Sequence, residues 1–138
     1  MVWRGDEQIG DAFEKIMQLE SMGKNVFFVT NNATKLPIDA ANKMRKMGLA
    51  EPKLNHVYTS AGCVAKYVVR KYPEARKIFV IGELALRLAF EAEGIEVVGA
   101  DTHVLDPTVI VDEKLFDKYE LDPEIKAVVV GLDFSFTH

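Results

Sequence analysis

The sequence has 138 residues, of which 49% are hydrophobic and 28% are charged, and its net charge is −4 at pH 7. This length and apolar content suffice for one domain or two small lobes and exclude a disordered protein, and the mixed signs of charge along the chain argue against a nucleic-acid partner. The first residues carry charges where a signal peptide is apolar, and no apolar run approaches the roughly 20 residues of a membrane span, so we expect a cytoplasmic protein without membrane contact.

The first predicted helix and strand lie within residues 9–29. Apolar side chains recur at helical spacing from Ile9 to Leu19, and Gly23 supplies the backbone freedom of a helix end, which predicts an amphipathic helix over residues 10–22. Residues 26–29 follow as a continuous apolar run, typical of a strand that is buried on both faces. We expect the phenylalanines of this run to belong to the hydrophobic core.

Two further helices flank the next predicted strand. Pro37 fits the first turn of a helix that Gly48 stops, and residues 56–59 follow as a short strand. Ser60 is placed to cap a third helix, which ends before the next proline. The single cysteine, Cys63, has no His or Cys near it at metal-ligand spacing, so we expect a small buried side chain there.

The second half of the chain repeats the order of strand, turn and helix. An alanine- and leucine-rich helix runs to Glu93, a weaker short helix is expected at residues 114–119, and Asp122-Pro123 predicts a turn. Short apolar runs predict the strands of this half: residues 78–81, 95–98, 109–111 and 127–130. The alternation favours a mostly parallel sheet that helices cover on both faces, joined by right-handed crossovers.

Three polar residues, Thr30, Asn31 and Asn32, follow the strand at residues 26–29. Ligands of open parallel sheets bind at the carboxyl ends of strands, where a Thr hydroxyl can donate to a phosphoryl oxygen. Asn amides can bind substrate or orient a carboxylate, because each amide both donates and accepts. From these residues alone the alternative stays open that they only close the strand and cap the next segment of the chain.

Residues 23–35 (Gly-Lys-Asn-Val-Phe-Phe-Val-Thr-Asn-Asn-Ala-Thr-Lys) resemble the second signature of haloacid dehalogenase-like phosphatases. The similar subgroup has a large α/β cap and includes 4-nitrophenyl phosphatase, phosphoglycolate phosphatase, pyridoxal phosphatase and the NagD-type enzymes. Five further segments resemble this subgroup in the same order: residues 3–7, 58–61, 80–83, 94–99 and 128–133. The resemblance spans the whole chain but only the front part of a family member.

The resemblance implies an α/β fold with a Rossmann-like, mostly parallel sheet. Residues 1–75 would form a partial haloacid dehalogenase-like core, without its central nucleophile strand, and residues 76–138 the front part of an α/β cap. Neither end has the elements that a complete sheet needs, because no apolar strand precedes the first helix and no crossover helix follows the strand at residues 127–130. We therefore expect a sequence that is cut at both ends.

The family resemblance also implies an aspartyl-phosphate mechanism. One Asp attacks phosphorus, a second Asp two residues later protonates the leaving oxygen, Mg²⁺ neutralises charge, and Thr30, Asn31 and Asn32 would bind the phosphoryl group. In this sequence no two Asp residues stand two apart, and the family's Lys and second acidic loop have no counterpart. The resemblance thus implies a fragment of a magnesium-dependent phosphatase for small phosphate monoesters of the phosphoglycolate or 4-nitrophenyl phosphate type, with a small phosphorylated metabolite as the partner of the complete enzyme. We expect the chain alone to be inactive and without bound Mg²⁺.

Two acidic segments leave alternatives open. Asp133, Ser135 and Phe136 resemble the cap segment that relatives turn towards the leaving group of the substrate. Ser135 stands where several relatives have His. The other interpretation of these three residues is a solvated turn. Residues 5–11 spell the family's acidic metal loop, Gly-Asp followed after four residues by Asp, but no buried strand precedes them. We expect Asp6 and Glu7 to lie ahead of a helix N-terminus, where negative charge is favoured.

A non-catalytic interaction module with the same fold is the alternative function. The absent central strand would leave unpaired backbone groups and bare apolar side chains beside residues 26–29, which a complementing chain or a second copy would cover. A dinucleotide-binding domain is a weaker alternative, since the sequence contains no Gly-x-Gly.

Overall fold

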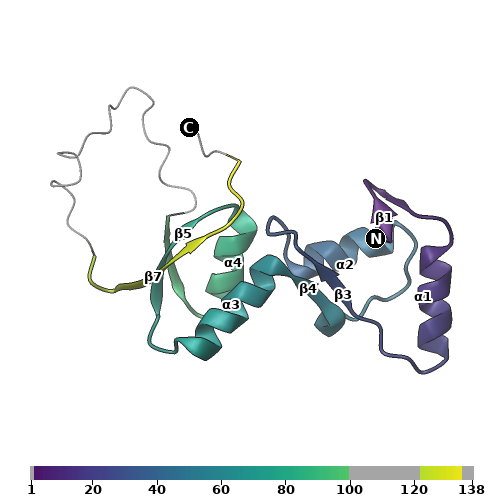
Figure 1. Cartoon of the computed structure of the whole chain (residues 1–138), viewed down its shortest axis with the longest axis horizontal. Coiled ribbons are helices and arrows are strands. Elements are labelled where there is room, and N and C mark those ends of the chain that lie inside the picture. Colours follow the sequence, from purple (N-terminus) through teal and green to yellow (C-terminus); the bar gives the residue numbers. More distant parts are fainter. Residues whose placement is uncertain (1, 100–121, 135–138) are drawn as a thin grey trace.

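The structure is a computed structural model, and it describes residues 2–99 and 122–134. Figure 1 shows two lobes along the long axis of the chain, with α3 (Ser60–Lys71) between them. The predicted strand at residues 109–111, the predicted helix at residues 114–119, Ser135 and Phe136 lie outside the described residues. Within those residues, no helix combines the length and the apolar character that crossing a bilayer requires.

The first lobe places a hairpin, two helices and a two-stranded parallel sheet around one core. Its elements are β1 (Trp3–Arg4), β2 (Glu7–Gln8), α1 (Ala12–Ser21), β3 (Phe28–Thr30), α2 (Pro37–Lys46), the 3₁₀ turn η1 (Leu54–His56) and β4 (Val57–Thr59). β1 pairs antiparallel with β2, and β3 pairs parallel with β4. Phe13 of α1 and Met44 of α2 are buried in the same cluster as Val57.

The second lobe is a three-stranded parallel sheet with helices packed on it. β5 (Lys77–Ile81) lies between β6 (Glu96–Gly99) and β7 (Ile125–Val130), and α4 (Leu84–Ala92) connects β5 to β6. Ile78 and Phe90 are fully buried in a cluster that also contains Ala61 and Ala65 of α3. α3 therefore packs on the second lobe although it follows β4 of the first. The domain boundary between residues 75 and 76 stays a prediction.

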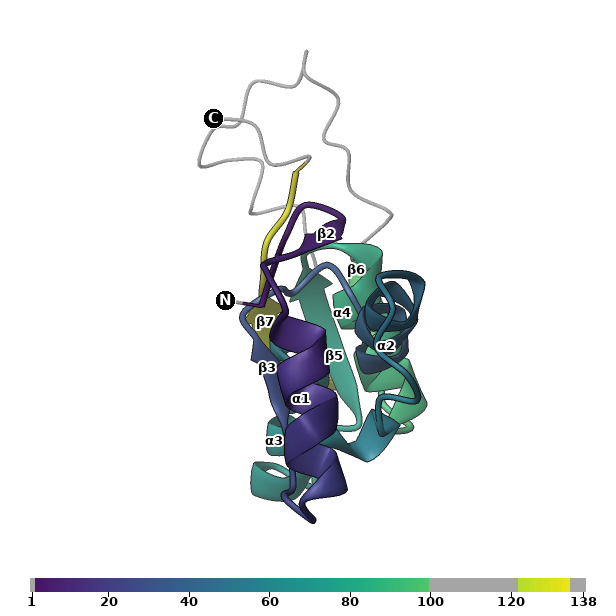
Figure 2. The same ribbon diagram turned by 90° about the vertical axis from the view of Figure 1, so that its right-hand side faces the viewer.

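Each sheet has an uncovered face, so the expectation of one sheet covered on both faces is wrong for the described residues. Val29 of β3 is 77% exposed and Val130 of β7 is 70% exposed. Phe27, which we expected in the core, is also more than half exposed. Figure 2 shows the reason, because α2 and α4 lie on one side of the molecule and β3 and β7 on the other.

Within the described residues, the predicted order of helices and strands from α1 onwards is confirmed, but three local interpretations are wrong. The N-cap of α3 is Thr59, whose Oγ1 accepts from the backbone N of Gly62 at 3.3 Å, and Ser60 is the first helical residue. Cys63 is exposed, since it lies on the side of α3 opposite the buried alanines. Glu7 lies in β2 and Asp6 in the hairpin turn, so neither stabilises a helix N-terminus.

Candidate functional site

The three polar residues predicted to bind phosphate lie at the carboxyl edge of the first sheet. Thr30 ends β3 and pairs in register with Thr59, which ends β4. Because parallel strands carry their carboxyl ends to the same edge, the turn after β3 and the start of α3 lie side by side. A hydrogen bond joins the two segments, because the side-chain Oγ of Ser60 donates to the backbone carbonyl O of Asn31 at 2.9 Å.

Hydrogen bonds inside the turn decide which polar groups can reach a ligand. The hydroxyl of Thr30 accepts from the backbone N of Asn32 at 3.2 Å, so its own proton can be donated to an external acceptor. Asn32 Oδ1 accepts from both the backbone N and Oγ1 of Thr34, at 2.8 Å each. The amide oxygen of Asn32 is thereby occupied, and its –NH₂ group is the part suited to donate to a ligand. Thr30, Asn31 and Asn32 thus form a donor-rich turn.

Two residues of this edge were not predicted as part of the site. Thr59 is fully buried and fixes the first turn of α3, while Ser60 ties that turn to Asn31. The N-terminus of a helix carries partial positive charge and favours anions. The sequence signal that identifies them resembles that for Thr30, because Thr59 ends the strand predicted at residues 56–59 and Ser60 follows it directly.

A hollow of about 360 Å³ opens beside Thr30 and Thr59. Its polar wall is the edge just described, and its apolar wall comes from β3, β4 and α3. Cys63 faces this hollow, contrary to the predicted buried position. The lining residues are Val29, Thr30, Asn31, Tyr58, Thr59, Ser60, Cys63, Val64 and Tyr67. None of them comes from the β7 segment, so within the described residues Asp133 does not join Thr30 in this hollow.

The described residues around Thr30 do not fit a Mg²⁺ site, because they offer a hydroxyl and amides but no carboxylate. Across residues 2–99 and 122–134 no three His, Cys, Asp or Glu side chains converge as metal ligands. The acidic pattern at residues 5–11 is engaged elsewhere: Asp6 accepts from Lys43 Nζ at 2.9 Å, which lowers the pKa of Asp6, and Asp11 lies 3.6 Å from Lys15 Nζ.

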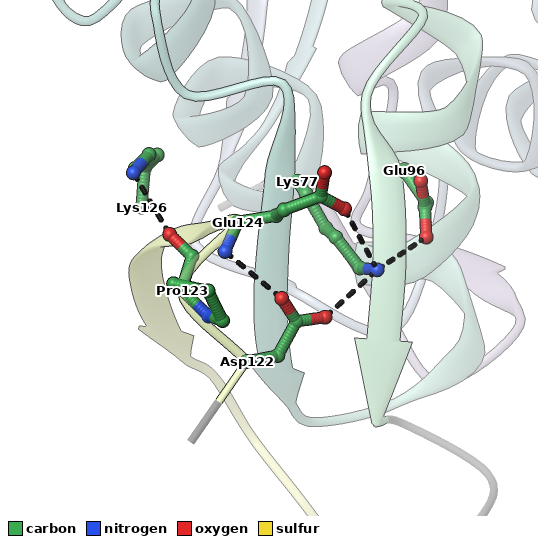
Figure 3. Close-up of polar contacts among 6 residues, drawn as sticks. All are labelled: Lys77, Glu96, Asp122, Pro123, Glu124 and Lys126. Carbon is green, nitrogen blue, oxygen red and sulfur yellow. Dashed lines mark hydrogen bonds and ion pairs between the residues drawn. The ribbon is translucent and has the colours of Figure 1, made fainter. Parts of the chain in front are cut away.

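A cluster of charged side chains around Lys77 lies at the amino-terminal edge of the second sheet. Figure 3 shows the ammonium of Lys77 among three carboxylates, 3.0 Å from Glu96, 2.9 Å from Asp122 and 3.7 Å from Glu124. Hydrogen bonds to Asp122 and Glu96 raise the pKa of Lys77, and the bond from Lys77 lowers the pKa of Asp122. The cluster joins the starts of β5 and β6 to the turn before β7, which gives it a structural role.

The predicted cap segment (Asp133, Ser135 and Phe136) begins after the end of β7. Asp133 is half-buried in the short stretch between β7 and Phe134, and its two predicted companions, Ser135 and Phe136, lie outside the described residues. Phe134 donates its backbone N–H to Glu83 Oε1 at 3.1 Å. Asp133 therefore belongs to the carboxyl edge of the second sheet, just as Thr30 belongs to that of the first.

Residues 1–96 match the family model described as haloacid dehalogenase-like hydrolase. The whole chain aligns at 30% identity with 43% of glycerol-3-phosphate phosphatase from Gallus gallus, and at 31% identity with 46% of 4-nitrophenylphosphatase from Schizosaccharomyces pombe. The chain thus spans less than half the length of these curated relatives.

Among solved structures, glycerol phosphate phosphatase from Mycobacterium tuberculosis in complex with magnesium shares the fold. It superposes with a TM-score of 0.68 over 97% of this chain and 34% of that protein, at 22% identity.

Proposed function

We propose, because this chain belongs to the haloacid dehalogenase-like hydrolase family, that its Thr30 turn is the phosphate-binding part of a phosphatase for small phosphate monoesters. The observation that carries this proposal is the donor arrangement at the carboxyl edge of the first sheet. The Thr30 proton, the Asn32 amide and the start of α3 all lie at this edge, which supports phosphate binding there. The relatives named for glycerol 3-phosphate, 4-nitrophenyl phosphate and phosphoglycolate support small phosphate monoesters as the substrate class.

By itself the 138-residue chain is expected to bind phosphate without hydrolysing esters. No pair of its Asp residues has the spacing of nucleophile and general acid, and groups that act as a unit lose their effect when the nucleophile is missing. Two or three hydrogen bonds to a charged oxygen contribute roughly 1.5–3 kcal/mol each, and association consumes part of this. The expected dissociation constant for phosphate is therefore about 1 mM or weaker.

The proposal is tested by titrating the chain with inorganic phosphate and following backbone amide NMR signals. We expect shifts of Thr30, Asn32 and Ser60 in the native chain and their loss in Thr30→Val, which keeps the shape of the side chain but removes the hydroxyl. Ser21→Ala is the matched control, because it removes an exposed hydroxyl that bonds only within α1. Equal phosphate responses of native chain and Thr30→Val would refute the assignment.

A parallel assay measures phosphate release from 4-nitrophenyl phosphate with added Mg²⁺. We expect no turnover by the pure chain, and robust turnover would contradict the argument from the missing nucleophile.

We further propose that residues 1–75 correspond to the family core and residues 76–138 to the cap. In this arrangement Asp133, Ser135 and Phe136 face the leaving group of the substrate.

The second candidate function is an interaction module without catalysis. It is favoured by the uncovered face of the first sheet, where Val29 and Phe27 are exposed, and by the free edge of β3, whose one hydrogen-bonded neighbour among the described strands is β4. A complementing chain or a second copy would cover both features. Sedimentation equilibrium across a wide concentration range separates the candidates, because a monomer at every concentration argues against self-association.

A further inference from the structure

The segment after β7 is fastened to the loop between β5 and α4. Gly131 donates its N–H to the carbonyl O of Ile81 at 2.8 Å, which extends the pairing of β7 with β5. The backbone N of Glu83 donates to the carbonyl O of Leu132 at 2.9 Å. The side chain of Glu83 then accepts from the backbone N of Phe134 at 3.1 Å, 51 residues away along the chain.

These bonds place Asp133 between two fixed points. The carbonyl before it and the N–H after it are both held by Glu83, one through its backbone and the other through its carboxylate. The backbone conformation of Asp133 is therefore constrained from both sides by one residue of another element.

The Glu83 side chain accepts from Phe134 and not from the backbone N–H groups of its own helix. Glu83 is the N-cap residue of α4, where an acidic side chain commonly accepts from the first backbone N–H groups of its own helix. Here the side chain makes no such cap bond. The carboxylate of Glu83 is directed to the segment after β7 instead of to the helix that it precedes.

The two chain segments approach each other closely at two glycines. An added Cβ at Gly131 would come within 2.8 Å of Leu86 Cδ2, and one at Gly82 would come within 3.3 Å of the carbonyl O of Leu132. The Glu83 contact is thus part of a packed junction at the carboxyl edge of the second sheet, the edge at which ligands of parallel sheets bind.

We propose that Glu83 is a positioning residue, which holds the backbone around Asp133 so that this carboxylate meets the organic, leaving-group side of a phosphate ester in one fixed orientation. This inference rests on the proposed function for the role of Asp133 towards substrate. The contact of Glu83 with Phe134 stands independently of it.

Amide hydrogen exchange of the complete chain, measured residue by residue, tests the proposal. In Glu83→Ala we expect the Phe134 amide to exchange about tenfold faster or more, because a bond to a charged acceptor is lost. Glu83→Gln retains an acceptor oxygen and is expected to restore most of the protection. Glu93→Ala, at the other end of α4, is the matched control and should leave Phe134 unchanged.

Two results would overturn the inference. Unchanged Phe134 protection in Glu83→Ala would show that the carboxylate does not hold the segment. Loss of protection throughout α4, without a specific effect at Phe134 and without rescue by Glu83→Gln, would show that Glu83 only supports its helix. The phosphate titration at Thr30 reports on the proposed function separately, because Glu83 does not line the hollow beside Thr30.

Discussion

At the scale of single residues, the hydroxyl groups of Thr30 and Thr59 have different tasks although they occupy paired positions. Thr30 accepts within its turn and keeps its proton for a ligand, whereas fully buried Thr59 accepts from the first turn of α3. The hydroxyl of Thr30 therefore belongs to the proposed binding surface, and the hydroxyl of Thr59 holds the helix that forms the neighbouring wall.

Thr59→Val should destabilise the chain by about 1 kcal/mol, because α3 loses its N-cap hydrogen bond while the volume of the side chain is preserved. Urea unfolding followed by circular dichroism measures this loss. Ser21→Ala, which removes an exposed hydroxyl from α1, should change stability by less than about 0.5 kcal/mol. Equal effects of the two substitutions would contradict the capping role of Thr59.

At the scale of elements, the second sheet is fixed by the junction of its strands at both ends. The Lys77 cluster ties the amino ends of β5 and β6 to the turn before β7, and Glu83 ties the carboxyl end of β7 to the start of α4. A shift in the pairing of β7 with β5 between Lys77 and Ile78 accompanies the first junction. The position of Asp133 thus depends on contacts at both ends of β7.

Lys77→Met should lower stability near neutral pH, because three carboxylates lose their shared cation. The lowered pKa of Asp122 means that its contribution is present above the unfolded value of about 3.9 and is lost as pH falls through the folded value. The raised pKa of Lys77 means that its contribution is present below about 10.4 and is lost as pH rises towards the folded value.

The measurement is the urea midpoint of native chain and Lys77→Met from acid to alkaline pH. The difference in urea midpoint between the native chain and Lys77→Met should be largest between the unfolded pKa values of about 3.9 and about 10.4. It should shrink at more acidic and at more alkaline pH. Lys15→Met is the control, since Lys15 pairs with one carboxylate and both side chains are mostly exposed. A constant difference at all pH values would rule out the ion cluster as its cause.

Gly99→Ala should destabilise the second sheet by about 2 kcal/mol or more, because Gly99 has a φ of +90° and an added Cβ would come within 2.4 Å of the carbonyl O of Val80. Gly23→Ala is the matched comparison, since Gly23 has a φ of +75° but open space around it, and it should cost about 1 kcal/mol. Thermal unfolding compares them. Equal losses of stability in Gly99→Ala and Gly23→Ala would show that the close approach of β5 and β6 does not add to the cost of a side chain at Gly99.

At the scale of the whole molecule, the chain has two separate hydrophobic clusters. Met44 belongs to the cluster of the first lobe and Ile78 to that of the second, and both are fully buried. The candidate phosphate site lies on the first lobe and the cap segment on the second. A chain with two cores need not unfold in one step.

Met44→Ala and Ile78→Ala should each cost about 2–5 kcal/mol, but in different parts of the molecule. We expect Met44→Ala to speed hydrogen exchange mainly in α1, α2, β3 and β4, and Ile78→Ala mainly in β5, β6, β7 and α4. Residue-resolved exchange measures both patterns. A uniform loss of protection in both variants would show that the two clusters unfold as one unit.

Within the described residues, the sequence by itself determined the order of the α-helices and strands from α1 onwards and the place of Thr30, Asn31 and Asn32 at a strand end. It did not predict the hairpin of β1 and β2. Hydrophobic periodicity, glycine stops and polar residues after apolar runs are local signals, and each is complete within a dozen residues. The family resemblance could be recognised from the sequence for the same reason, because it depends on short motifs in a fixed order. The boundaries moved by only a few residues in the structure.

Only the tertiary structure decided which side chains face solvent and which distant segments meet. Phe27 and Val29 are exposed because helices cover one face of the sheet, and Cys63 is exposed because it lies on the side of α3 opposite the buried alanines. Apolar character alone does not encode either fact. The contact of Glu83 with Phe134 and the gathering of Glu96 and Asp122 on Lys77 join residues far apart in sequence. Such contacts depend on strand pairing and packing, which are fixed only when the whole chain has folded.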